Sequence, residues 1–233
     1  MSSVESTPRA LTNLDEKENC MRKSLIFLSL ILFAFGAEAR SAQPIDVLRD
    51  GVDQVLKVLK ESRSKDKEQR RQQRERLWTV IEKTFDFREM GARSLARYWN
   101  DFSEEQKEVF TVLFSKLLGN TYIEKMQTGY HDEKVLYAGQ EIITESKAVV
   151  KTKVLREGRE IPVDYSMLIK NGKWLVYDVH IEGISLIKNY RSQFSAILMK
   201  NSPADLIELL KKKVAQVEQV SNTCKSRLIK SKA

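Results

Sequence analysis

The chain has 233 residues, of which 40 are Lys or Arg and 32 are Asp or Glu, so its net charge is +8 at pH 7. That length can bury one sizeable hydrophobic core, and two cysteines are too few for a disulfide framework. The sequence contains no glycine-rich phosphate loop, no G-x-S-x-G elbow, no H-E-x-x-H motif and no paired-cysteine zinc spacing, which excludes the nucleotide-binding, hydrolase and zinc classes that depend on those motifs.

The first predicted element is a cleaved secretory signal peptide over residues 21–39. Met21-Arg22-Lys23 supplies the positive start, residues 25–37 form an almost unbroken apolar run, and Ala37-Glu38-Ala39 supplies small residues for cleavage. The apolar run is shorter than the ~20 residues that a transmembrane helix needs. Residues 1–20 match no part of a signal peptide, so we interpret them as a disordered, over-extended start.

Export decides how the basic charge is interpreted. Residues 1–39 hold four of the 40 basic and five of the 32 acidic residues, so cleavage leaves 36 against 27 and a net charge of about +9. A basic excess attracts polyanions, but nucleic acid is not an expected partner outside the cytoplasm, and no arginine-rich stripe with interleaved aromatic residues is present. Much of the charge lies between Arg63 and Arg76, which predicts a solvated helix face and a candidate docking surface. Cleavage also leaves Cys224 as the single cysteine.

The first half of the mature chain predicts helices. Apolar residues recur at helical spacing over residues 45–59, and the charged segment that follows becomes apolar at residues 77–81. Helical spacing returns over residues 90–99. Ser103 and Gln106 then form a capping box, which predicts the start of a further long helix.

From Lys134 the hydrophobic pattern changes from helical to alternating. Glu157-Gly158 and Asn171-Gly172 each lie between alternating runs and predict two-residue hairpin turns with positive φ. The resulting register predicts an inward apolar face made of Ala148, Val150, Thr152, Val154, Ile161, Val163, Tyr165, Met167, Ile169, Trp174 and Val176. The third strand is apolar on its outward side as well, so another element should cover Leu175, Tyr177, Val179 and Ile181.

Two helices complete the predicted domain. Helical spacing returns over residues 186–198, and Ser202-Pro203 with Asp205 predicts the start of the last helix. That helix continues into a basic helical end and tail over residues 211–233. Because the chain has no internal repeat and no low-complexity linker, residues 40–210 predict a single α+β domain, with an antiparallel sheet and helices packed over one face.

One polar group could support chemistry. Asp178, His180 and Glu182 alternate along the third strand and so should project to one side, with Tyr165 opposite Asp178. A carboxylate and a tyrosine beside an apolar pocket could perform acid–base chemistry of the ketosteroid-isomerase kind, whereas the plainer interpretation gives Asp178 a structural hydrogen bond. The pattern also leaves open whether the inward face is a solid core or a ligand cavity, because both use the same residue types.

Short motifs follow one another in a characteristic order along the mature chain. The helical half contains Phe85-Asp86-Phe87, Met90, Leu95, Trp99, Gln106, Phe110, Phe114, Leu117-Leu118 and Tyr122. The second half contains Tyr165-x-Met167, Trp174-x-Val176-Tyr177-Asp178-Val179, Gly183-Ile184-Ser185-Leu186 and Asn189-Tyr190-Arg191-x-Gln193-Phe194. In this order the motifs resemble the MlaC (toluene-tolerance) family. One departure is Ala96, where the family often carries a glycine before its tryptophan; alanine costs little in a helix, so the departure bears only on how closely another segment approaches there.

The resemblance implies a curved sheet in a nuclear-transport-factor-2-like fold, forming a lipid-binding cup for acyl chains. It implies a monomeric periplasmic carrier of a Gram-negative bacterium, which shuttles phospholipid between an outer-membrane lipoprotein complex and an inner-membrane ABC transporter with an MCE-domain protein. Such a carrier maintains outer-membrane lipid asymmetry, carries phospholipid as cargo, and needs no cofactor, metal or catalytic residue.

The resemblance and the predicted register together give a candidate cavity lining. The expected lining residues are Val150, Val163, Tyr165, Met167, Trp174 and Val176 from the sheet, with Trp99, Phe114, Leu118 and Tyr122 from the helices. Two alternatives remain at this point. One is a nuclear-transport-factor-2-like enzyme acting on a small apolar substrate, and the other is an exported structural domain with a solid core.

Overall fold

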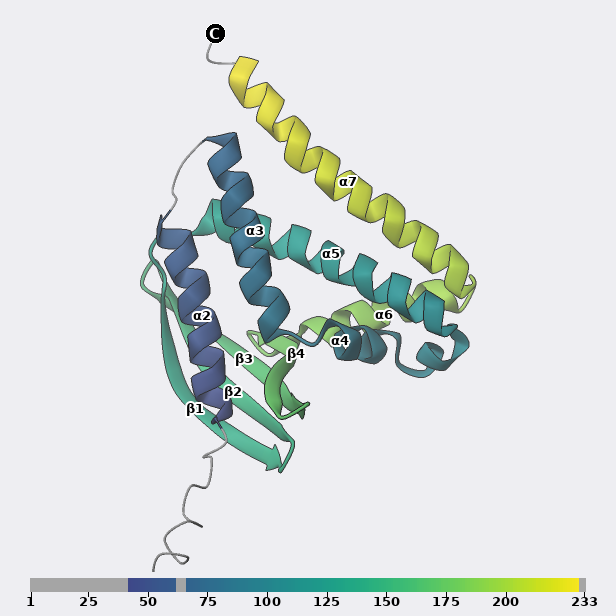
Figure 1. Ribbon diagram of the computed structural model, residues 1–233, viewed down its shortest axis with the longest axis horizontal. Coiled ribbons are helices and arrows are strands. Elements are labelled where there is room, and N and C mark those ends of the chain that lie inside the picture. The colour runs from purple at the N-terminus through teal and green to yellow at the C-terminus, as the bar shows by residue number, and fades with distance from the viewer. Residues whose placement is uncertain (1–41, 62–65, 231–233) are drawn as a thin grey trace, which may run out of the picture. The chain divides into compact units, whose positions relative to one another are not determined.

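A computed structural model describes residues 42–61 and 66–230, with side chains described up to residue 217 (Figure 1). The predicted start over residues 1–20 and the predicted signal peptide over residues 21–39 lie outside the described residues. The helices are α2 (Pro44–Glu61), α3 (Lys67–Thr84), α4 (Phe87–Leu95), the 3₁₀ helix η1 (Ala96–Asp101), α5 (Glu104–Gly129), α6 (Leu186–Leu198) and α7 (Pro203–Lys230). The strands are β1 (Lys134–Thr144), β2 (Lys147–Arg156), β3 (Arg159–Lys170), β4 (Lys173–Ile181) and β5 (Ile184–Ser185).

The five strands form one antiparallel sheet in the order β1-β2-β3-β4-β5. Both predicted hairpin turns are confirmed. Glu157 and Gly158 have φ of 50° and 77°, and Asn171 and Gly172 have φ of 51° and 74°. Two central residues with positive φ match the right-handed twist of the strands they join.

The register departs from the prediction at one point on β4. Met167 pairs with Val176 and Ser166 pairs with Asp178, so Tyr177 is an extra residue in a β-bulge. The predicted pairing of Tyr165 with Asp178 is therefore wrong, since Tyr165 lies opposite Val179. An extra residue reverses the alternation beyond it, which moves Val179 to the inward face and places Asp178 on the other side with Ser166.

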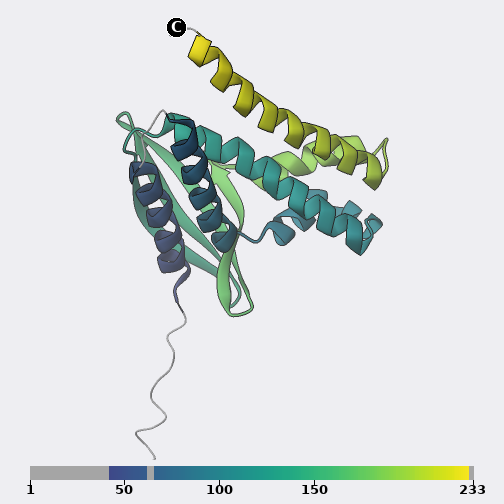
Figure 2. The same ribbon diagram turned by 45° about the horizontal axis from the view of Figure 1, so that its top comes forward.

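Helices α2 and α3 cover the inward face, with α2 packed on β1 and β2 and α3 packed against β4 (Figure 2). A sheet cluster, as we call it, joins α2 to the sheet through buried residues of both: Leu48, Ala148, Val150, Met167, Trp174 and Val176. Polar contacts fix α2 at β1 as well, because the Ile45 amide donates to Gln140 Oε1 at 2.9 Å and the Tyr137 hydroxyl donates to Asp53 Oδ1 at 3.4 Å. The predicted α+β class with helices over one face of an antiparallel sheet is confirmed.

A second set of helices forms a larger apolar cluster beside β4. This helical cluster is built from α4, η1, α5, α6 and α7, and its buried side chains include Phe102, Phe110, Phe114, Leu118, Phe194 and Leu206. Helices α4 and α6 also contact β4, and Tyr177 packs against the helical cluster. The prediction that another element covers the outward side of this strand is therefore confirmed for Tyr177.

The spacing over residues 90–99 predicted one helix, but this segment is divided into two helices. Helix α4 ends at Leu95, and the 3₁₀ helix η1 follows. Ala96 at the junction has φ 52° and ψ −122°, a conformation that residues with a Cβ rarely adopt. The expectation that alanine costs little at this position is wrong, because the position is not helical.

Candidate functional site

The sheet supplies a continuous apolar surface beneath α2 and α3. Four of the six predicted sheet residues are buried together in the sheet cluster, namely Val150, Met167, Trp174 and Val176. Tyr165 is partly buried and packs against the same cluster, whereas Val163 is buried on the inward face but belongs to neither the sheet cluster nor the helical cluster. The structure therefore brings the sheet half of the predicted lining together.

The helical half of the predicted lining lies in the helical cluster instead. Phe114 and Leu118 are buried there, and Trp99 and Tyr122 pack at its margin. Phe114 is held by aromatic neighbours, with ring centroids 5.0 Å from Tyr190 and 5.5 Å from Phe194. These four residues thus contact a different set of side chains from the sheet residues.

An aromatic row leads from α3 to the sheet. The rings of Trp78 and Phe87 stack with centroids 5.4 Å apart, and those of Phe87 and Phe85 with centroids 6.1 Å apart. Phe85 packs against both the sheet cluster and the helical cluster, and its backbone forms a bridge with Val176. Trp78 was not among the predicted lining residues, although the apolar end of the charged helix was a signal for it.

Gly119 on α5 explains how Trp78 is seated. A Cβ placed at Gly119 would lie 2.5 Å from Cζ3 of the Trp78 ring. A glycine in a helix interior costs about 1 kcal/mol of stability relative to alanine. A glycine inside a long helix therefore indicates that another group packs closely against the helix backbone at that position. Here the approaching group is the indole ring of α3.

Asp86 locks this row to the sheet. Its carboxylate accepts hydrogen bonds from the Glu89 amide at 3.0 Å and from Lys170 Nζ at 2.6 Å, and its own amide donates to the Val176 carbonyl at 2.9 Å. The side chain of Asp86 is 5% exposed, so the ion pair is shielded on the carboxylate side. One residue thereby caps α4 and fixes the α3–α4 junction on the β3–β4 hairpin.

Three tyrosines carry polar groups within otherwise apolar surroundings. Burial raises the pKa of Tyr165 and of Tyr190 to about 12, and it raises the pKa of Tyr122 as well. Each phenol is protonated at neutral pH, as an unperturbed phenol also is, and can donate a hydrogen bond. Tyr165 belongs to the sheet face, whereas Tyr122 and Tyr190 belong to the helical cluster.

Asp178 and Tyr165 do not form the possible acid–base pair, because they project from opposite faces of the sheet, although His180 Nε2 lies 3.6 Å from Asp178 Oδ2. Asp178 accepts hydrogen bonds from Ser185 Oγ at 2.6 Å, from the Ile187 amide at 3.0 Å and from the Val179 amide at 2.8 Å. It therefore serves the start of α6, in line with the plainer interpretation. The predicted alternation of all three residues is wrong for Glu182, which has φ 51° in the turn after β4.

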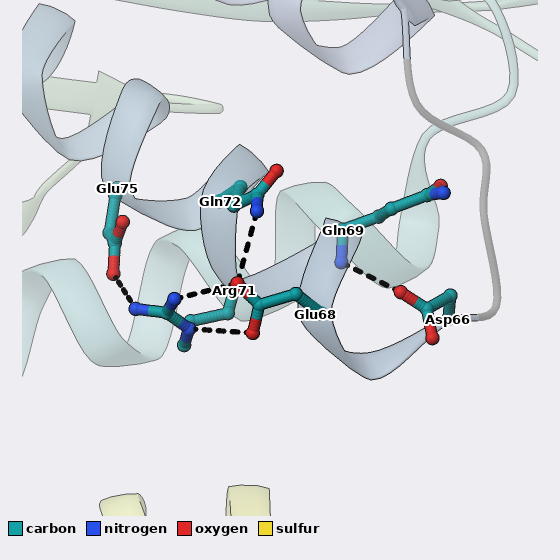
Figure 3. Close-up of polar contacts among 6 residues, drawn as sticks. All are labelled: Asp66, Glu68, Gln69, Arg71, Gln72 and Glu75. Carbon is teal, nitrogen blue, oxygen red and sulfur yellow. Dashed lines mark hydrogen bonds and ion pairs between the residues drawn. The ribbon is translucent and has the colours of Figure 1, made fainter.

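The basic segment over residues 63–76 does not present a uniformly positive face where it is described. Arg71 forms ion pairs with Glu68 and Glu75, each at 2.6 Å, as Figure 3 shows. In the same view Gln72 donates to Glu68, and the Asp66 carboxylate caps the helix by accepting from the Gln69 amide. Arg76 pairs with Glu61 of α2. The guanidinium groups of Arg71 and Arg76 are thus already matched by carboxylates of this chain.

The comparisons with known proteins fit this architecture. A family model described as MlaC protein matches residues 49–212. This chain belongs to the MlaC family. It is 20% identical over 204 residues to the intermembrane phospholipid transport system binding protein MlaC of Haemophilus influenzae, covering 84% of this chain and 95% of that protein.

A solved structure has a similar fold. It is the phospholipid-binding protein from Ralstonia solanacearum in complex with a phospholipid, with a TM-score of 0.67 and 24% sequence identity, covering 76% of this chain and 99% of the other. Among the helices of this MlaC-family chain that the structure describes, none is both long and apolar enough to cross a membrane.

Proposed function

We propose that this protein is a periplasmic phospholipid carrier. The match to the MlaC family over residues 49–212 carries the proposal. In the relatives, phospholipid is named both as the transported cargo and as the bound ligand. We propose that the predicted signal peptide over residues 21–39 directs export and is then cleaved. Cleavage would free the protein to move between membranes.

A carrier of this kind must shield acyl chains from water. Each methylene group costs about 0.8 kcal/mol when it leaves an apolar environment for water, so two exposed chains would prevent release from a membrane. The inward face of the sheet, beneath α2 and α3, offers a surface of the required chemistry. We place the acyl chains there, against Val163, Tyr165 and Met167, and the headgroup towards water.

The remaining predicted lining residues belong to the same proposal. Val150, Trp174 and Val176 form the floor, and Phe85 connects that floor to the helical cluster. Only acyl chains that pass the aromatic row of Trp78, Phe87 and Phe85 would reach the four predicted lining residues of the helices, Trp99, Phe114, Leu118 and Tyr122. The proposed partners are an outer-membrane lipoprotein complex and an inner-membrane ABC transporter with an MCE-domain protein, and the proposed chemistry is non-covalent.

Native mass spectrometry of the protein purified from the periplasm tests the carrier function. We expect phospholipid to copurify, to be lost on extraction with chloroform and methanol, and to be regained from phospholipid vesicles. A protein that arrives without lipid and takes up none from vesicles would contradict the proposal.

A pair of variants tests the location of the cargo. Val163→Lys puts a charge on the buried inward face, whereas Leu136→Lys puts the same charge on the outward face, where Leu136 pairs with Lys153 and is 46% exposed. We expect the first variant to lose lipid and the second to retain it, with circular dichroism confirming that both are folded. Equal retention by both variants would show that the chains lie elsewhere.

A further inference from the structure

One end of the sheet carries three exposed isoleucines. Ile142 and Ile143 lie near the end of β1 and Ile169 near the end of β3, and they are 53%, 52% and 36% exposed. The Ile169 amide donates to the Ser146 carbonyl at 2.9 Å, which joins the β1–β2 turn to β3. The β3–β4 turn and the start of α2 lie at this same end (Figure 1). The three apolar side chains therefore gather at one end of the sheet.

This end continues the apolar face on which we place the acyl chains. Ile142 lies opposite Ala148, and Ile169 lies opposite Trp174. Both of these cross-strand neighbours are buried in the sheet cluster, so Ile142 and Ile169 are the exposed continuation of the inward face. Ile45 at the start of α2 packs against the same cluster. The inward face thus meets the outside of the molecule at the three isoleucines.

Exposed lysines accompany the three isoleucines. Lys170 and Lys173 lie directly opposite each other across the β3–β4 hairpin, an arrangement that destabilises a sheet because the two charges repel. Asp86 pairs with Lys170 at 2.6 Å, which neutralises one of the two lysines. Lys147 adds a positive charge beside the β1–β2 turn, and Glu145 in that turn adds one negative charge. This end of the sheet therefore has an excess of positive charge beside its exposed apolar side chains.

The outward face of the same sheet has a different arrangement of charges. Lys151 pairs with Glu141 at 3.1 Å, and Lys153 pairs with Glu160 at 2.7 Å, so the charges of these residues cancel. Apolar side chains flanked by unneutralised lysines instead suit the interface of an anionic bilayer. There the apolar side chains enter between the headgroups, and the ammonium groups contact the lipid phosphates.

We infer that a docking rim, formed by Ile142, Ile143, Lys147, Ile169 and Lys173, binds the surface of an anionic lipid bilayer. The inference goes beyond the proposed carrier function, because it names the surface through which the protein meets a membrane directly. Docking through this rim places the exposed end of the inward face against the bilayer. An acyl chain then passes between the bilayer and the inward face without crossing water, which avoids a cost of about 0.8 kcal/mol for each methylene group.

Sedimentation with vesicles measures docking of the protein purified from the periplasm. We expect it to bind vesicles of equal phosphatidylglycerol and phosphatidylcholine, and to bind vesicles of phosphatidylcholine alone much more weakly. Ile142→Ser combined with Ile143→Ser should weaken binding to the anionic vesicles roughly tenfold or more, because apolar area is no longer buried in lipid. Lys147→Gln combined with Lys173→Gln should do the same, since each lysine near an anionic surface contributes about fivefold.

Matched variants control for the loss of apolar area and of charge. Ile181→Ser combined with Ile184→Ser removes two exposed isoleucines at the opposite end of β4, where Glu182 lies in the turn between them. Lys134→Gln combined with Lys188→Gln removes two exposed lysines outside the rim, at the start of β1 and on α6. Both control variants should bind the anionic vesicles as the wild type does. Circular dichroism confirms that all four variants are folded.

Hydrogen–deuterium exchange on the wild-type protein gives an answer that needs no variant. The backbone amides over residues 142–147 and 169–173 should exchange more slowly in the presence of anionic vesicles than in their absence. Unchanged exchange over both segments, or protection confined to another surface, would overturn the inference.

The outcomes separate docking from the carrier function. Docking is refuted, and the carrier function stands, if the wild type binds no vesicles or if the rim variants bind as tightly as the control variants. It is also refuted if the wild type is a dimer that the Ile142 and Ile143 substitutions convert to a monomer, since a second copy of this chain then covers the rim. A protein that docks through the rim but holds no phospholipid in native mass spectrometry supports docking and contradicts the carrier function.

Discussion

Ala96→Gly should stabilise the protein, although it places a glycine next to a helix. Ala96 has φ 52° and ψ −122° at the junction of α4 and η1, and its amide donates to the Ala92 carbonyl. Flanking contacts fix this conformation: Leu95 is fully buried, Arg97 donates to the Tyr98 hydroxyl at 2.9 Å, and Arg88 lies over the Trp99 ring. The backbone cannot relax without disturbing them, so the strain persists in the folded state.

The magnitude follows from two opposing effects. A residue with a Cβ in such a conformation costs about 1–3 kcal/mol, which glycine removes. Glycine also gives the unfolded chain more freedom, which costs about 0.4–1 kcal/mol of stability. The net effect is a gain of up to about 2.6 kcal/mol, centred near ~1.3 kcal/mol. At that central value a domain of this size should melt roughly 3–5 °C higher.

Thermal and urea unfolding of the wild type and two variants measure this gain. Ala92→Gly is the control, because Ala92 lies inside α4, where glycine should destabilise by about 0.5–1 kcal/mol. Opposite signs for the two substitutions are the expected result. If Ala96→Gly lowers the melting temperature as Ala92→Gly does, the junction is helical in solution and the strain argument is wrong.

Two further predictions concern the packing and ionisation of the site. Gly119→Ala should destabilise the protein by about 1 kcal/mol, because overpacking against Trp78 costs about 1–3 kcal/mol and exceeds the gain in helix propensity. Gly129→Ala is the control and should be tolerated, because its Cβ would lie 3.6 Å from a nitrogen of the flexible Arg156 side chain. Urea unfolding measures both, and equal effects would contradict the close approach. Stability should also fall as the pH rises from about 10 to about 12, because the unfolded state loses the Tyr165 proton first. Tyr165→Phe should lessen that fall in stability. A variant whose stability depends on pH as that of the wild type does would contradict this prediction.

Local sequence determined the hairpins and the helix starts. Asn171-Gly172 fixes a two-residue turn because few other pairs adopt positive φ at both positions, and the structure has that turn. The Ser103–Gln106 capping box is likewise present, with both of its hydrogen bonds. The alternation that follows Lys134 also predicted which side chains of β2 and β3 point inward, since that depends only on the period of a strand.

Tertiary structure decided what depends on contacts distant in sequence. The bulge at Tyr177 cannot be recognised from the hydrophobic alternation of β4 itself. It places Asp178 at the start of α6 and Val179 on the same face as Tyr165. The break at Ala96 and the seat of Trp78 on Gly119 were also hidden, because each arises where one helix meets another. Periodicity assigned the residues of β2 and β3 to faces correctly and failed on β4 beyond the bulge, and it could not tell which faces meet. For that reason the predicted lining divides between the sheet cluster and the helical cluster, with Phe85 packed against both.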